Sequence, residues 1–145
     1  MKRIRIIIAG SRDFNDYPKL NEEVFRILLK VNMKYGIDKE QFEIVSGHAR
    51  GADLLGERFA DQYGIKKKVF PVTREEWNRF GKSAGYRRNA EMARYAVDNS
   101  IGILIAFWDK KSNGTKSMIE LANRYKLNEV YVVNFWKEYL WIINL

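Results

Sequence analysis

The stretch IRIIIAGSR, residues 4–12, decides the expected fold. Three successive isoleucines, Ile6 to Ile8, leave no polar face, which predicts a strand that is covered on both sides. Strands of this kind are typical of parallel sheets flanked by helices. Gly10 then allows the chain to leave the strand with unobstructed backbone N–H groups, and Ser11 adds a hydroxyl donor.

The same unit recurs along the chain: an apolar run, a polar break that contains glycine, and a segment with helical spacing. The predicted strands are residues 4–9, 42–45, 69–72 (with Lys66 to Lys68 at its amino end), 101–107 and 130–135. The predicted helices are residues 18–35, 54–63, 84–97 and 115–125, with Gly36 as a helix stop and Thr73 and Glu76 as a capping box. Because strands and helices alternate, consecutive strands should be parallel. We therefore expect a single domain over residues 1–145, an α/β three-layer sandwich around a doubly wound, mostly parallel five-stranded sheet.

Composition excludes several classes of site. The 145-residue chain has no cysteine and one histidine, His48. Disulfides, cysteine nucleophiles and multi-histidine metal centres are therefore excluded, and no metal site is expected. No apolar run approaches the ~20 residues of a membrane span, and the run from Ile6 to Ala9 is too short for a secretory segment, so the expected location is the cytosol. A net charge of +8 favours an anionic partner.

The last ten residues, 136–145, are rich in apolar side chains. They predict a final helix or strand that covers an edge of the sheet, or alternatively a contact in a homo-oligomer. The sequence leaves both interpretations open.

Glycine and polar residues gather in the breaks that follow strands, namely residues 10–13, 46–53 and 109–115. The carboxyl ends of parallel strands meet the N-termini of the helices at one edge of the sheet, so these breaks should share one ligand site. Unpaired amides at the helix starts would face an anion there. In this site His48 would hydrogen-bond a phosphate or fill its loop position without contacting the ligand, and Asp53 would cap its helix or accept a sugar hydroxyl.

A fourth segment, residues 81–89, places Lys82, Arg87 and Arg88 just before or within the start of a long helix. Arginine suits bidentate binding of phosphate. Basic residues modestly outnumber acidic ones near the predicted site, which fits one or two phosphates better than a long nucleic-acid track. The candidate catalytic acids or nucleophiles are Asp53, Asp109 and Glu120, and no pair among them indicates one reaction.

Four ordered motifs carry a family resemblance: GSRDF, VSGHARGAD, GKSAGYRRNAEM and AFWDKKSNGT. Together they resemble the YspA-like branch of the SLOG superfamily, which joins the DNA-processing DprA proteins with the LOG phosphoribohydrolases. The resemblance implies a Rossmann-like fold, frequent self-association and a nucleotide or nucleotide-derived ligand. Position by position, it places around the ligand Gly10, Ser11, Arg12, Ser46, Gly47, Arg50, Gly51, Asp53, Arg88, Asn89, Asp109, Ser112, Gly114 and Thr115.

The sequence departs from the LOG pattern at its catalytic motif. LOG enzymes carry PGGxGTxxE, whereas this chain has Lys111-Ser112-Asn113 before Gly114 and Met118 at the glutamate position, with Glu120 two residues later. The expected function is therefore binding of a phosphorylated, nucleotide-like ligand, as a sensor, carrier or sequestering protein. Two alternatives stay open: hydrolysis of an N-glycosidic or phosphoester bond of a nucleotide, and binding of single-stranded nucleic acid in the manner of DprA.

Overall fold

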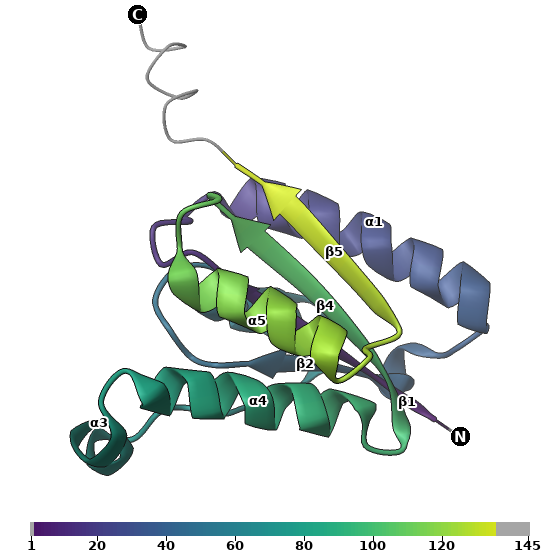
Figure 1. The fold of residues 1–145 in the computed structure, drawn as a ribbon. Helices are drawn as coiled ribbons and strands as arrows, with labels where there is room; N and C mark the ends of the chain where they lie inside the picture. The colour runs from purple at the N-terminus through teal and green to yellow at the C-terminus, as the bar shows by residue number, and fades with distance from the viewer. Residues whose placement is uncertain (1, 136–145) are drawn as a thin grey trace, which may run out of the picture.

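The computed structural model describes residues 2–135, which form an α/β sandwich (Figure 1). Its strands are β1 (Arg3–Gly10), β2 (Phe42–Ser46), β3 (Lys66–Val69), β4 (Ser100–Trp108) and β5 (Glu129–Asn134). Its helices are α1 (Tyr17–Tyr35), α2 (Ala52–Tyr63), α3 (Arg74–Phe80), α4 (Ser83–Val97) and α5 (Asn113–Arg124), with a 3₁₀ turn, η1, at Lys39–Gln41. The predicted role of residues 136–145 lies outside the described residues.

The five described strands form one sheet in the order β3-β2-β1-β4-β5, and every neighbouring pair is parallel. This confirms the predicted fold class. The chain builds outward from β1 to β2 and β3, and then crosses to the other side of β1 for β4 and β5. The connections therefore change direction between β1 and β4, where open α/β sheets bind ligands, beyond the carboxyl ends of the strands.

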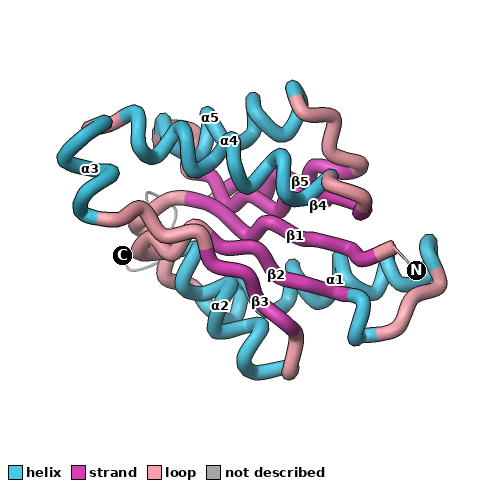
Figure 2. Tube along the Cα trace, turned by 90° about the horizontal axis from the view of Figure 1, so that it is seen from below, coloured by secondary structure: helices cyan, strands magenta, loops and turns pink. Residues whose placement is uncertain are grey.

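Two hydrophobic clusters cover the two faces of the sheet, and β1 contributes to both. Ile4, Ile6 and Ile8 are fully buried against the layer that contains α1 and α2. Ile7 is fully buried on the opposite face, against the layer that contains α4 and α5. Figure 2 shows the two helical layers with the sheet between them. Burial from both sides explains why this strand consists of isoleucine with no polar alternation.

The third strand differs from its predicted position. Lys66 to Val69 pair with Glu43 to Ser46 at the edge of the sheet, so β3 consists of the lysines that were expected only to begin it. Phe70 donates one more backbone hydrogen bond to Ser46, and Pro71 then ends the ladder because it has no N–H to donate. Exposed lysines on an edge strand discourage pairing with another sheet.

Two predicted helix signals are confirmed. Gly36 ends α1 in the left-handed region, at φ 59°, and its amide donates to Asn32 O. Thr73 and Glu76 form a reciprocal capping box at the start of α3. Within residues 2–135, no helix is both long and apolar enough to cross a membrane.

Candidate functional site

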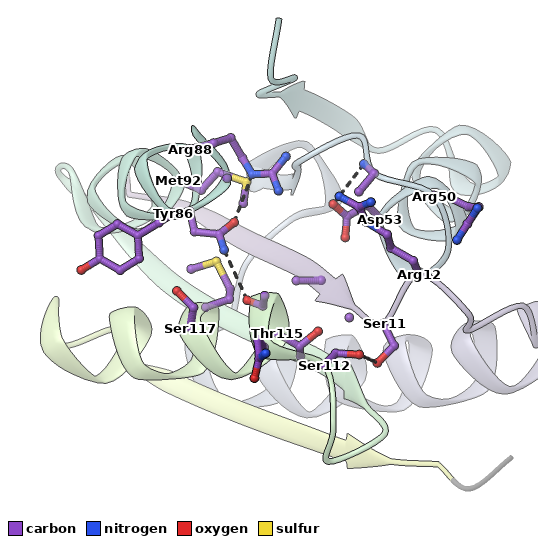
Figure 3. A pocket seen from close by; sticks show the side chains of 18 of the residues that line it. Ser11, Arg12, Arg50, Asp53, Tyr86, Arg88, Met92, Ser112, Thr115 and Ser117 are labelled. Atoms are coloured by element: carbon purple, nitrogen blue, oxygen red, sulfur yellow. Dashed lines mark hydrogen bonds between the residues drawn. The ribbon is translucent and has the colours of Figure 1, made fainter. Parts of the chain in front are cut away.

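A cavity of about 650 Å³ lies beyond the carboxyl ends of β1 and β4 (Figure 3). Four segments that are distant in sequence contribute to its wall: the β1–α1 loop, the β2–α2 loop with the first turn of α2, the first half of α4, and the start of α5. The sequence-predicted residues that line it are Gly10, Ser11, Arg12, Arg50, Asp53, Arg88, Asn89, Ser112, Gly114 and Thr115. Helix α3 adds Trp77 to the wall.

Helix capping distinguishes the cavity from the rest of the molecule. Away from it, α1 is capped by the Asp16 carboxylate and α3 by the Thr73 hydroxyl. The three helices that begin at the cavity, α2, α4 and α5, have no side-chain cap at their N-termini. Ala52 N of α2 and Ala84 N of α4 donate to the carbonyls of Ser11 and Gly81, at 3.4 and 3.0 Å. The other first-turn amides of the three helices can face solvent or a bound anion, and the helix dipoles favour the anion.

Ser11, Asp109 and Ser112 connect the β1–α1 loop to the β4–α5 loop. The hydroxyls of Ser11 and Ser112 lie 2.8 Å apart, so Ser112 bonds to Ser11 rather than capping α5. Asp109 Oδ1 accepts from the amides of Lys111 and Ser112 at 2.9 and 2.8 Å. Burial opposes ionisation of Asp109, but these amides and the two serine hydroxyls outweigh it and lower its pKa. Asp109 therefore holds the loop in shape and does not line the cavity.

Arg88 and Asn89 join α4 to the loop after β2 and to the first turn of α5. The Arg88 guanidinium donates to Gly47 O at 2.5 Å and to Asn89 Oδ1 at 3.0 Å. Asn89 Nδ2 in turn donates to Gly114 O at 3.4 Å. A Cβ at Gly47 would lie 2.7 Å from Arg88 Cζ, so only glycine leaves room for the guanidinium. One hydrogen-bonded chain thus links α4 to the β2–α2 loop and to the start of α5.

Asp53 is the buried carboxyl group of the cavity, with 5% of its surface exposed. Ala49 N donates to its Oδ2 at 3.2 Å. Burial raises the pKa of Asp53 to about 6, even though Arg88, the Ala49 amide and Arg12 act to lower it. Burial also lowers the pKa of Arg88. The carboxyl group therefore changes charge close to neutral pH, inside a cavity lined by Arg12, Arg50, Lys82 and Arg88.

This pKa predicts a pH-dependent contribution of Asp53 to stability. Because its folded pKa is about 6 against an ordinary value of 3.8, its contribution is fully present below pH 3.8 and is lost as the pH rises through 6. As the pH rises from 4 to 8, the free energy of unfolding of Asp53→Asn, measured by urea denaturation, should therefore increase relative to that of the wild type by up to about 3 kcal/mol.

Asp109→Asn is the matched control, because the pKa of Asp109 is shifted in the opposite direction. A lowered folded pKa stabilises the protein above the ordinary pKa, and that stability disappears as the pH falls. The Asp109 variant should therefore be less stable than the wild type at pH 7, with the gap narrowing toward pH 3. A free energy gap between Asp53→Asn and wild type that stays constant with pH would contradict the assignment.

Several predicted site residues lie away from the cavity. Ser46 is fully buried, and its hydroxyl donates to Glu57 Oε2 at 2.8 Å. His48 Nδ1 lies 2.8 Å from the same oxygen, so the imidazole turns toward α2 instead of the ligand edge. Gly51 packs against the backbone of Ser11, and Glu120 is exposed further along α5. With Gly47 and Asp109, these residues do not line the cavity, so of the candidate acids only Asp53 does.

The sequence placed the segment 81–89, with Lys82, near the site, but the predicted ligand residues omit Gly85, Tyr86 and Met92, which line the cavity together with Lys82 and the predicted Asn89. Gly85, Asn89 and Met92 recur at helical spacing, because they lie on α4. That periodicity was the available signal, but it does not say which face of α4 turns toward the cavity. Among residues 2–135, no group of three or more His, Cys, Asp or Glu side chains is placed to hold a metal ion.

Comparisons with known proteins agree with the fold. A family model described as the "YspA, cpYpsA-related SLOG family" matches residues 4–79. The Gene 61 protein of Mycobacterium phage D29 is 32% identical over 139 residues, which is 90% of this chain and 95% of the phage protein. The X-ray structure of DNA processing protein A (DprA) from Streptococcus pneumoniae is similar with a TM-score of 0.65 and 19% identity. That similarity covers 94% of this chain but 52% of DprA, so this chain spans about half the DprA length.

Proposed function

The chain belongs to the YspA, cpYpsA-related SLOG family, and from this premise we propose that its cavity binds a nucleotide or nucleotide-derived phosphorylated ligand. The protein would then act as a sensor, carrier or sequestering protein for that ligand. Self-association, which the sequence also predicts, is a separate prediction and is not needed for this function.

The observation that carries the proposal is the meeting of three uncapped helix N-termini around one basic cavity. Backbone amides at such ends satisfy phosphate oxygens directly. Arg12, Arg50, Lys82 and Arg88 add positive charge, against the carboxyl groups of Asp13 and Asp53. The hydroxyls of Ser11, Ser112 and Thr115 supply neutral donors along the same wall. This combination supports a ligand with one or two phosphates.

Titration calorimetry with ribose 5-phosphate and nucleoside 5′-monophosphates in 0.3 M NaCl tests the proposal. Arg50 is exposed, so Arg50→Ala should keep the fold and weaken binding about fivefold, through loss of one charge-assisted hydrogen bond. Lys66→Ala is the control, because it removes the same charge from an exposed position at the amino end of β3, on the edge of the parallel sheet opposite the cavity. Equal losses in both variants, or no binding of any probe to the wild type, would contradict the proposal.

Single-stranded DNA is the second candidate, favoured by the fold shared with a DNA-processing protein and by the net charge of +8. Binding to a phosphate track depends steeply on salt, because each contact releases counterions. An oligothymidylate titrated between 50 mM and 300 mM NaCl should therefore lose affinity over orders of magnitude if DNA is the ligand. A mononucleotide held by backbone amides and few basic side chains should lose far less over the same range.

A further inference from the structure

Helix α1 carries a second apolar surface, on the side that faces away from the sheet. Phe25, Leu29 and Met33 follow one another at intervals of four residues, so they form one row along the helix, which we call the outer row. They are 44%, 55% and 86% exposed, whereas the residues that fix α1 to the sheet lie on the opposite side and are buried. Figure 2 shows α1 in the outer layer of the sandwich, beside α2.

The stability of a single copy does not explain the outer row. Exposed apolar residues that are scattered singly are normal on protein surfaces. Here, however, three of the seven large apolar side chains that are exposed within residues 2–135 lie in one line on one helix. A helix with apolar residues on two opposite sides is typical of a helix that is packed from both sides. The outer row therefore indicates contact with a further apolar surface.

The charges beside the outer row suit a second copy of the same helix. The exposed Glu22 and Lys30 flank the row on the same side, Glu22 in the first half of α1 and Lys30 in the second. If a second α1 runs antiparallel, with Phe25 opposite the partner's Leu29, each Glu22 lies beside the partner's Lys30. Arg26, on the same flank, is already paired with Glu23 at 2.6 Å. Opposite charges would thus meet twice about a two-fold axis, which is the self-complementarity that a symmetric dimer needs.

The size of the outer row limits the affinity of such a contact. Its three side chains expose on the order of 400 Å² in each copy, which is the size of the largest apolar patches of typical monomers. A standard stable interface buries about 800 Å² per partner, which the row reaches only in part, even with its flanking residues. The expected complex is therefore weak and reversible, with a dissociation constant of about 10–100 μM.

From these features we infer that the outer row is the interface of a weak, two-fold symmetric dimer in which the two α1 helices pack antiparallel. Residues 136–145, which are also rich in apolar side chains, are the alternative occupant of the row. They follow Phe135, which packs on Phe14 ahead of α1, whereas Met33 lies near the other end of the helix. A second antiparallel helix covers the whole row at once. The inference concerns a surface other than the cavity and does not rest on the proposed function.

Sedimentation velocity of the full chain between 5 and 300 μM tests the dimer. The average mass of the wild type should rise with concentration from 17.1 kDa toward twice that value. Leu29→Glu places a charge in the middle of the row and should weaken dimerisation at least tenfold, while the circular dichroism spectrum stays unchanged because the position is exposed. Val132→Glu is the control. It puts the same charge at an exposed apolar position of β5, on the opposite face of the sheet, and should change the dissociation constant less than twofold.

Charge reversal tests the antiparallel arrangement. Glu22→Lys and Lys30→Glu each bring like charges together at both ends of the contact, so each should weaken the dimer about fivefold. The double variant exchanges the two charges and should return to within twofold of the wild-type dissociation constant. A double variant that is weaker than either single variant would show that the helices do not pack in this order.

Three further outcomes would overturn the dimer or its surface. A wild type that stays monomeric at 300 μM rules out the dimer. If that monomer also loses thermal stability on Leu29→Glu, independently of concentration, residues 136–145 cover the row instead. If the wild type does dimerise but Val132→Glu weakens it as much as Leu29→Glu does, the contact does not lie on the outer row.

Discussion

Replacing Gly51 with alanine is expected to cost about 4 kcal/mol of the free energy of unfolding, or to prevent folding altogether. Gly51 has φ 90° and ψ −131°, a backbone conformation that side chains with a Cβ adopt only under strain of about 1–3 kcal/mol. The new Cβ would also lie 2.4 Å from Ser11 O and 2.6 Å from Arg12 O. Both neighbours are backbone atoms, so no rotamer change relieves the overlap, which adds about 1–3 kcal/mol.

The strain at Gly51 would act directly on the cavity. Ser11 O accepts a hydrogen bond from Ala52 N at 3.4 Å, so the β1–α1 loop rests on the start of α2. Pushing the loop away would separate Ser11 and Arg12 from the wall formed by α2. Urea denaturation followed by circular dichroism measures the loss. Gly85→Ala is the control, because its Cβ enters open space and should leave stability unchanged or raise it by about 0.5–1 kcal/mol. A loss below 1 kcal/mol for Gly51→Ala would show that the loop yields easily.

The central strands could be predicted from sequence because burial on both faces requires apolar residues at successive positions. Residues 6–8 and 103–107 are fully buried, so both stretches are continuously apolar. The edge strand β3 has no continuous apolar stretch that would reveal it. Its lysines are exposed, and the backbone ladder to β2 holds them in place, so hydrophobic periodicity could not place the strand correctly. Sheet pairing depends on partners distant in sequence, and no local pattern encodes them.

The candidate site was predictable to the level of loops and not to the level of side chains. Parallel topology alone brings the loops after β1, β2 and β4 to one edge, where the structure places them around one cavity. Which way a side chain turns at a strand end depends on its neighbours. Ser46 turns inward because the buried Glu57 accepts its hydroxyl, and Asp109 turns back to the amides of its own loop. Trp77 was missed because nothing local showed that α3 would reach the cavity.

Replacing Arg88 with methionine is expected to cost about 3 kcal/mol of stability at pH 8, because it leaves the buried carboxylate of Asp53 without the positive charge that acts on it most strongly. Arg88 also donates to Gly47 O, so that carbonyl loses its partner as well. The loss should shrink at pH 5. Removing the guanidinium raises the pKa of Asp53 above its value of about 6, and the carboxyl group is then protonated and neutral at the lower pH.

Two further variants separate the charge effect of Arg88 from its packing. Arg87→Met removes the neighbouring guanidinium, which is exposed and stacks on Phe80, and it should change stability by less than about 0.5 kcal/mol. The double variant Arg88→Met with Asp53→Asn removes the buried charge together with its partner, and at pH 8 it should be about 2 kcal/mol more stable than the sum of the two single-variant changes predicts. If the double variant is as unstable as the sum of the two single variants predicts, Arg88 stabilises the fold through its hydrogen bonds alone. A coupling of this size would instead show that the cavity's arginine keeps Asp53 ionised at neutral pH, in the site where a phosphate is expected to bind.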